Sequence, residues 1–199
     1  LEPVYLPRPW WEEERLTSTI SPESVEKALT EHSEIKTVCI TSPSYCGLLC
    51  DVKEISHMVH RNGGRLIVDG AHGAHLPFLG VDASAGADVV VCSAPTTLPA
   101  LGQSALLLAG ERFPHAGLRR AASLYGSPSP SYPMMACLDP CRAWLEEEGA
   151  AAYRAAARHV AALRRDYPRA SGPALEPPRR APRAPHRFAA HAAVEGSGV

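Results

Sequence analysis

The chain of 199 residues lacks both a surplus of one charge and any long apolar run. Its 20 Lys and Arg against 21 Asp and Glu leave a formal net charge of −1, so the composition gives no support to nucleic-acid binding. No apolar stretch approaches the roughly 18 residues of a membrane-spanning helix. A secretory signal is also missing from the opening residues, which mix Pro, Arg and Glu. These absences exclude a membrane protein and a disulfide-stapled secreted domain, and they predict a globular chain of about one domain.

The six cysteines do not follow a common metal-binding pattern. Two pairs, Cys46/Cys50 and Cys137/Cys141, have three intervening residues, whereas zinc knuckles have two. Cys39 and Cys92 lie within apolar runs, and we expect both to be buried, since cysteine packs as a small hydrophobic residue. Without a secretion signal, reduced thiols and a cytoplasmic location are expected. The chain does not begin with Met, from which we expect a processed chain or a fragment.

Composition and charge change toward the C-terminus. Residues 1–148 carry a net charge of −7, and residues 149–199 carry +6. From Pro168 onward the chain has six prolines, many alanines and no periodic apolar pattern. Such a segment cannot bury enough apolar surface to offset its ordering entropy. We therefore expect a folded unit over residues 1–165 and a disordered Pro/Ala/Arg-rich tail over 166–199, with a basic arm for an acidic partner as the alternative.

Residues 1–165 alternate between helical and strand patterns. Short apolar strands connected by helices are typical of a mostly parallel sheet covered by helices on both faces, an α/β three-layer sandwich. Ser21 and Asp51 precede apolar-periodic segments and are expected to cap two helices. The expected strands are 36–41, 66–69, 87–92 and 105–108, and two further helices are expected at about 133–148 and 150–165.

Polar residues follow three of the expected strands, in segments 41–47, 69–75 and 93–97. Ligands of open parallel sheets bind beyond the carboxyl ends of the strands, so these segments form the candidate site. Asp69 ends an apolar strand, where a carboxylate is costly without a partner. It is either a structural cap or salt-bridge partner, or a counter-charge for a cationic ring nitrogen or a metal. With His72 and His75 it could form a metal site, although the neighbouring glycines argue against a regular helix there.

Several of these segments together resemble one enzyme family. The segments Ile40–Gly47, Leu66–His75 and Gly86–Ser93, with the continuations 97–103 and 129–139, resemble the large domain of the Orn/Lys/Arg decarboxylases. The likeness runs from about Pro3 to about Arg165. It implies an aspartate-aminotransferase fold (fold type I), here incomplete, and pyridoxal 5'-phosphate as cofactor.

The resemblance also implies residue roles. Asp69 would pair with the pyridine nitrogen and keep it protonated, so that the ring acts as an electron sink. Ala71 would pack on the ring, His72 would lie beside it, and Ser93 would bind the phosphate. The segment 129–132 would lie near the site of a neighbouring subunit, because sites of this family form at dimer interfaces. The substrate would be a basic amino acid.

One departure from the family pattern affects catalysis directly. Where the family has Ser-X-His-Lys-Thr-Leu, this chain has Ser93-Ala94-Pro95-Thr96-Thr97-Leu98. Thr96 thus replaces the lysine that attaches the cofactor, and Pro95 replaces the histidine. The chain has only three lysines, and none is placed to substitute: Lys27, Lys36 and Lys53. Family segments that precede and follow this region are also absent from the sequence, and Gly70 stands where an acidic residue is common.

We therefore expect a fragment of a basic amino-acid decarboxylase that is inactive as it stands and binds pyridoxal phosphate weakly. The first alternative is a non-catalytic partner or cofactor-binding subunit, which would pair with a complete homologue. The second is a metal-dependent hydrolase that uses Asp69, His72 and His75.

Overall fold

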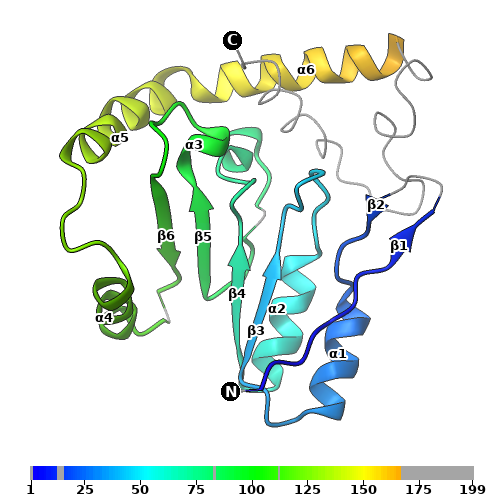
Figure 1. Cartoon of the computed structure of the whole chain (residues 1–199). Coiled ribbons are helices and arrows are strands. Elements are labelled where there is room, and N and C mark those ends of the chain that lie inside the picture. Colours follow the sequence, from blue (N-terminus) through cyan, green and yellow to red (C-terminus); the bar gives the residue numbers. More distant parts are fainter. Residues whose placement is uncertain (1, 13–15, 83, 112, 167–199) are drawn as a thin grey trace.

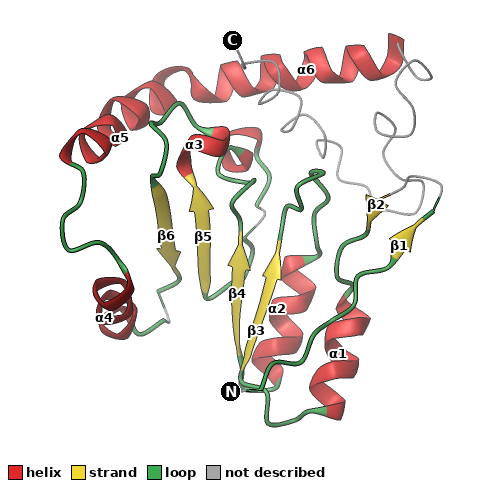
Figure 2. Ribbon diagram, in the orientation of Figure 1, coloured by secondary structure: helices red, strands yellow, loops and turns green. Residues whose placement is uncertain are grey.

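The structure is a computed structural model that describes residues 2–12, 16–82, 84–111 and 113–166. Its elements (Figures 1 and 2) are β1 (Trp10–Trp11), β2 (Leu16–Thr17), α1 (Pro22–Glu31), β3 (Thr37–Thr41), α2 (Val52–Arg61), β4 (Arg65–Asp69), the 3-10 helix η1 (Leu76–Leu79), β5 (Val89–Ser93), α3 (Ala94–Thr97), β6 (Ala105–Ala109), α4 (His115–Tyr125), α5 (Tyr132–Trp144), the π-helical turn η2 (Leu145–Gly149) and α6 (Ala150–Asp166). The expected tail lies, from residue 167 onward, outside the described residues.

The main sheet has the strand order β3-β4-β5-β6. The first three strands are parallel, and β6 runs antiparallel to β5. The predicted α/β class with a mostly parallel sheet is confirmed. The reversed β6 follows from its connection: only α3 and a short loop separate it from β5, and parallel strands need a longer crossover.

Helices α1 and α2 cover one face of the sheet. Val38, Ile40, Leu66, Val68, Val90 and Cys92 point into this layer and form one core with apolar side chains of both helices. The predicted helix starts are confirmed: the Ser21 hydroxyl accepts a hydrogen bond from the Ser24 N–H at 3.3 Å, and Asp51 Oδ1 accepts one from the Glu54 N–H at 3.0 Å. Helix α2 ends at Arg61, and the turn that follows contains Gly63, whose φ of +68° suits glycine.

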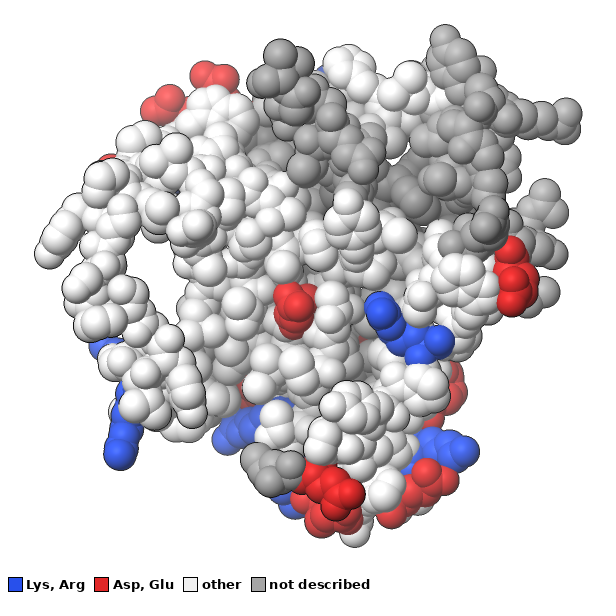
Figure 3. Space-filling model, viewed as in Figure 1, with Lys and Arg blue, Asp and Glu red and all other residues white. Residues whose placement is uncertain are grey.

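The opposite face of the sheet carries no helix within the described part of the chain, so the sandwich is incomplete (Figure 1). Along each strand the side chains alternate between the faces, and the alternate set includes Cys39, Asp69, Val91 and Leu107. Val91 is 38% exposed and Leu107 is 44% exposed. Figure 3 shows this open face, with few charged side chains over the middle of the sheet.

Cys39 corrects one expectation. Cys92 is buried as predicted, but Cys39 is exposed. The apolar run around Cys39 suggests burial on both faces, yet the strand alternation turns Val38 and Ile40 toward the helices and leaves Cys39 on the open face.

The C-terminal helices lie across the carboxyl ends of the strands (Figure 1). The two expected helices are present, joined by η2 into an almost continuous run from Tyr132 to Asp166. Helix α4 has no buried residue and was not expected from the sequence. None of the helices in the described ranges is long and apolar enough to cross a membrane.

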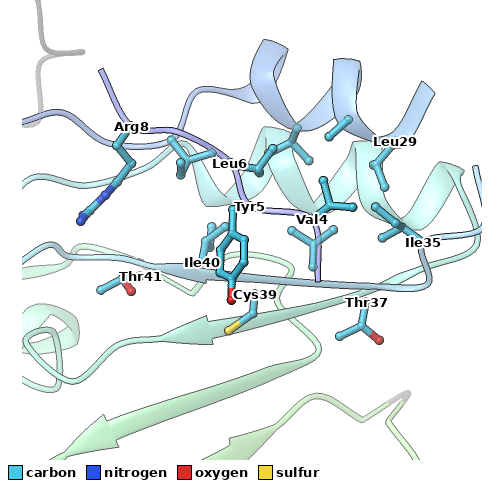
Figure 4. Close-up of a pocket in the computed structure, with 14 residues that line it drawn as sticks. Val4, Tyr5, Leu6, Arg8, Leu29, Ile35, Thr37, Cys39, Ile40 and Thr41 are labelled. Carbon is cyan, nitrogen blue, oxygen red and sulfur yellow. The ribbon is translucent and has the colours of Figure 1, made fainter. Parts of the chain in front are cut away.

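A cavity of about 330 Å³ lies at the outer edge of β3, between the segment 4–8 and α1 (Figure 4). Its lining is mixed, with apolar side chains such as Leu6 and Leu29 and polar ones such as Thr37. Figure 4 shows Arg8 and Tyr5 at its margin, with Tyr5 above Cys39. The cavity follows the length of β3 and reaches Thr41 at the carboxyl end of that strand, and its described lining brings together no cluster of catalytic groups.

Candidate functional site

The carboxyl ends of β3, β4 and β5 meet at one edge of the sheet, as the sequence predicts. The register pairs Thr41 with Asp69 and Asp69 with Val91, so Asp69 is central. Ser93 follows two residues after Val91 and therefore points to the same open face as Asp69. The three polar segments of the sequence are thus neighbours in space.

Asp69 is held by its backbone and by a local turn. Its carbonyl accepts a hydrogen bond from the Ser42 N–H at 2.9 Å, and the next amide, Gly70 N–H, donates to the Val91 carbonyl at 2.8 Å. The carboxylate accepts the Ala71 N–H on Oδ1 at 3.1 Å. Asp69 is exposed. The ion pairs among the described residues do not include it. The carboxylate therefore keeps acceptor capacity for a cationic or N–H group of a ligand.

The segment after Asp69 packs closely on the loop after β3. A Cβ on Gly73 would approach Pro43 Cδ to 2.7 Å, so only glycine fits at this contact. The ring of His72 meets the ring of Tyr45 edge-on, with centroids 5.6 Å apart. Ala71 and His72 are both half-buried beside Asp69. Tyr45 was not singled out in the sequence, although it lies in the polar segment after the first strand.

His75 lies apart from this group. It is only 2% exposed, and its ring packs on Tyr153 of α6 with centroids 5.5 Å apart. Neither ring nitrogen has a hydrogen-bond partner among the described residues. Burial lowers the pKa of His75 to about 4, so the ring is neutral near pH 7. Only two residues lie between His72 and His75, yet their rings pack on different aromatic side chains.

The described residues contain no group of three or more His, Cys, Asp or Glu side chains arranged to hold a metal ion. The alternative of a metal site formed by Asp69, His72 and His75 thus gains no support from this part of the chain.

Thr96 lies directly beside Ser93. It belongs to α3, which begins immediately after Ser93, and its hydroxyl donates a hydrogen bond to Ser93 Oγ at 2.5 Å. Pro95 precedes it in the same short helix. Thr96, which the resemblance aligns with the family's lysine, therefore lies at the strand ends beside the hydroxyl of Ser93.

The three lysines lie elsewhere. Lys27 is on α1 and pairs with Glu31 at 3.8 Å. Lys36 precedes β3, at the opposite end of the strand from Thr41, where its Nζ donates to the Asn62 carbonyl at 3.0 Å. Lys53 is on α2, which covers the face opposite to Asp69. None of the three lysines thus brings its amine to the strand ends where Asp69 and Ser93 lie.

Thiol groups near Asp69 are kept protonated. Loss of solvation, partial for Cys39 and greater for the buried Cys92, raises the pKa values of both thiols, and the negative charge of Asp69 adds to this. A thiolate nucleophile is therefore disfavoured at this site.

Residues 2–172 match the family described as "Orn/Lys/Arg decarboxylase, major domain". The uncharacterised protein YaaO of Bacillus subtilis is 34% identical over 151 residues, which cover 73% of this chain and 32% of that protein. An arginine decarboxylase of Bacillus cereus is 34% identical over 137 residues, covering 66% of this chain and 30% of that enzyme. The chain thus spans about a third of the length of these curated relatives.

Solved structures share the fold at low sequence identity. The constitutive lysine decarboxylase of Escherichia coli superposes with a TM-score of 0.65 at 19% identity, over 82% of this chain and 25% of that chain. The lysine decarboxylase of Francisella novicida gives a TM-score of 0.67 at 19% identity, with the same coverage of 82% and 25%. The predicted fold type is confirmed by these similarities.

Proposed function

This chain belongs to the Orn/Lys/Arg decarboxylase family, within the major domain, and on that premise we propose that it binds pyridoxal phosphate weakly and without covalent attachment. As it stands, it does not decarboxylate ornithine, lysine or arginine. The observation that carries the proposal is Thr96, whose hydroxyl bonds to Ser93 at the position where the family has its lysine.

The residues present fit the non-covalent part of cofactor recognition. Asp69 offers a carboxylate for the protonated pyridine nitrogen, and Ser93 offers a hydroxyl for the phosphate. Ala71 and His72 would flank the ring. When bound, pyridoxal phosphate supplies an electron sink for a carbanion. The residues do not fit the covalent part, because a threonine hydroxyl cannot replace a lysine amine.

Titration with pyridoxal phosphate, followed by borohydride reduction and peptide mass mapping, tests this proposal. We expect a weak, reversible absorption change, no covalent pyridoxyl group after reduction, and no release of carbon dioxide from the three amino acids. A reduced adduct at Lys27, Lys36 or Lys53 that supports turnover would overturn the absence of activity. A complete lack of binding would overturn the retained recognition.

The exposed region from α4 into α5 favours a second candidate role, as a partner in an oligomer. Leu124 is 72% exposed, Tyr125 87%, Tyr132 78% and Met135 52%. Large exposed apolar side chains along one stretch of a chain are a feature of protein-protein contact surfaces. By the resemblance, the segment 129–132 would lie near the site of a neighbouring subunit, and we extend the proposal to a dimer of this chain through this region.

Light scattering of the purified chain checks the dimer. We expect twice the 21.3 kDa of one chain, and a monomer after the double substitution Leu124→Glu/Tyr125→Glu, since two charges on this surface would have to be desolvated in the interface. Lys27→Glu, which adds negative charge on α1, is the control and should remain dimeric. A wild-type chain that scatters as a monomer contradicts this role.

A further inference from the structure

Tyr153 contacts both α3 and the segment that follows β4, at the carboxyl ends of the strands. It lies in the first turn of α6, and its hydroxyl donates a hydrogen bond to the Thr97 carbonyl at 2.6 Å. Thr97 is the last residue of α3, so its carbonyl is one of those that a helix end leaves without an intrahelical partner. The bond therefore ties α6 to the short helix that carries Thr96.

The ring of the same side chain contacts the segment that follows β4. It stacks on Phe78 with centroids 5.7 Å apart and an interplanar angle of 28°, and it lies 5.5 Å from the ring of His75. Trp144 of α5 meets it edge-on at 6.5 Å. Aromatic pairs at these separations are attractive beyond their buried area. One side chain thus holds both η1, which comes after Ala71 and His72, and α3.

The hydroxyl group is suited to this contact. Burial, with a contribution from the nearby Cys141 thiol, raises the pKa of Tyr153 to about 12. It therefore remains a protonated donor to the Thr97 carbonyl at neutral pH.

We propose that Tyr153 is a positioning residue: it fixes α3 against η1 and so sets the place of Ser93 and residue 96 relative to Asp69. Tyr153 acts on the site through the Thr97 carbonyl and through the rings of His75 and Phe78. Only the part of the proposal that concerns cofactor attachment rests on the proposed function.

Amide hydrogen exchange of the ligand-free chain tests the proposal without any cofactor. Tyr153→Phe keeps the aromatic contacts and removes the hydroxyl. We expect exchange in the peptide over 93–104 to become about fivefold faster, the factor that one ordinary hydrogen bond supplies, while peptides of β4 keep their rates. Tyr153→Leu, which also removes the ring, should extend the faster exchange to residues 71–79. Tyr5→Phe, at a residue 84% exposed, is the matched control and should change neither region.

A second measurement tests whether the position of α3 affects the reaction of residue 96 with pyridoxal phosphate. In a chain with Pro95→His and Thr96→Lys, adding Tyr153→Phe should slow covalent capture of pyridoxal phosphate at residue 96 about fivefold, with Tyr5→Phe again without effect. Unchanged exchange in 93–104, or a uniform increase over the whole chain, overturns the proposal. So does changed exchange with unchanged capture. If the parent chain captures no cofactor, the proposed cofactor site fails, and the exchange comparison still decides whether Tyr153 holds α3.

Discussion

The double substitution Pro95→His/Thr96→Lys is expected to turn a chain that forms no covalent adduct with pyridoxal phosphate into one in which most molecules carry it at residue 96. Thr96 already bonds to Ser93, so a lysine there starts from the same strand ends as Asp69. Borohydride reduction followed by peptide mapping measures the adduct. Decarboxylation should remain far below that of a complete enzyme, since orientation and phosphate anchoring contribute much of the rate.

The control for this experiment is a lysine placed away from Asp69 and Ser93. Thr30 is exposed on α1, where its hydroxyl donates to the Glu26 carbonyl, and Thr30→Lys adds a solvent-accessible amine far from Ser93. It should remain unmodified under conditions that label residue 96. Equal labelling of both variants would show nonspecific reaction. If the double variant is not labelled, the strand ends with Asp69 and Ser93 do not bind the cofactor.

Stability is expected to fall as the pH drops from about 6.5 to about 4, because His75 is buried in its neutral form. Its pKa is about 4 in the folded chain against a usual value of 6.5, so the unfolded chain takes up the proton first. The contribution of His75 to stability is complete above pH 6.5 and is lost on acidification. The shift corresponds to a decrease of about 3 kcal/mol in the free energy of unfolding.

Urea unfolding at a series of pH values measures this decrease. His75→Phe keeps an aromatic ring against Tyr153 and removes the titrating group, so its unfolding free energy should depend less on pH over this interval. His57→Gln, on the exposed side of α2, should keep the wild-type dependence.

The titration of Asp88 does not contribute to the loss of stability between pH 6.5 and pH 4. Burial opposes its ionisation, but hydrogen bonds from the Leu66 N–H, His60 and Arg65 outweigh burial and lower its pKa below 3.8. Its contribution to stability is therefore lost only at a lower pH. If the unfolding free energies of wild type and His75→Phe depend equally on pH, the pKa of His75 is not lowered in the folded chain, and this prediction is contradicted.

Local chemistry made much of the fold predictable. Ser21 and Asp51 act as caps because their side chains satisfy helix N–H groups whatever the rest of the chain does. Asp69 and Ser93 could be placed at one sheet edge because parallel strands bring their carboxyl ends together.

Features that depend on distant partners were not predictable in this way. The exposure of Cys39 depends on what covers each face of the sheet, and an apolar run contains no sign of that. The role of Tyr153 depends on a contact with Thr97, 56 residues away, and the Ala-rich helix around it has no distinguishing pattern. The direction of β6 follows from its short connection to β5. The length of that connection predicts an antiparallel pair only when β5 is known to be the neighbour of β6.

The antiparallel pairing of β5 with β6 has a consequence for the order of folding. The two strands are joined through α3 and a loop of a few residues, whereas β3, β4 and β5 pair across helical crossovers. Closing a short connection costs less chain entropy, and local pairings form faster than distant ones. The turn with Ser93 and Thr96 is thus part of the most local pairing of the main sheet. We infer that it takes shape before Asp69 is brought beside it, so that substitutions at residue 96 act on a segment that forms early.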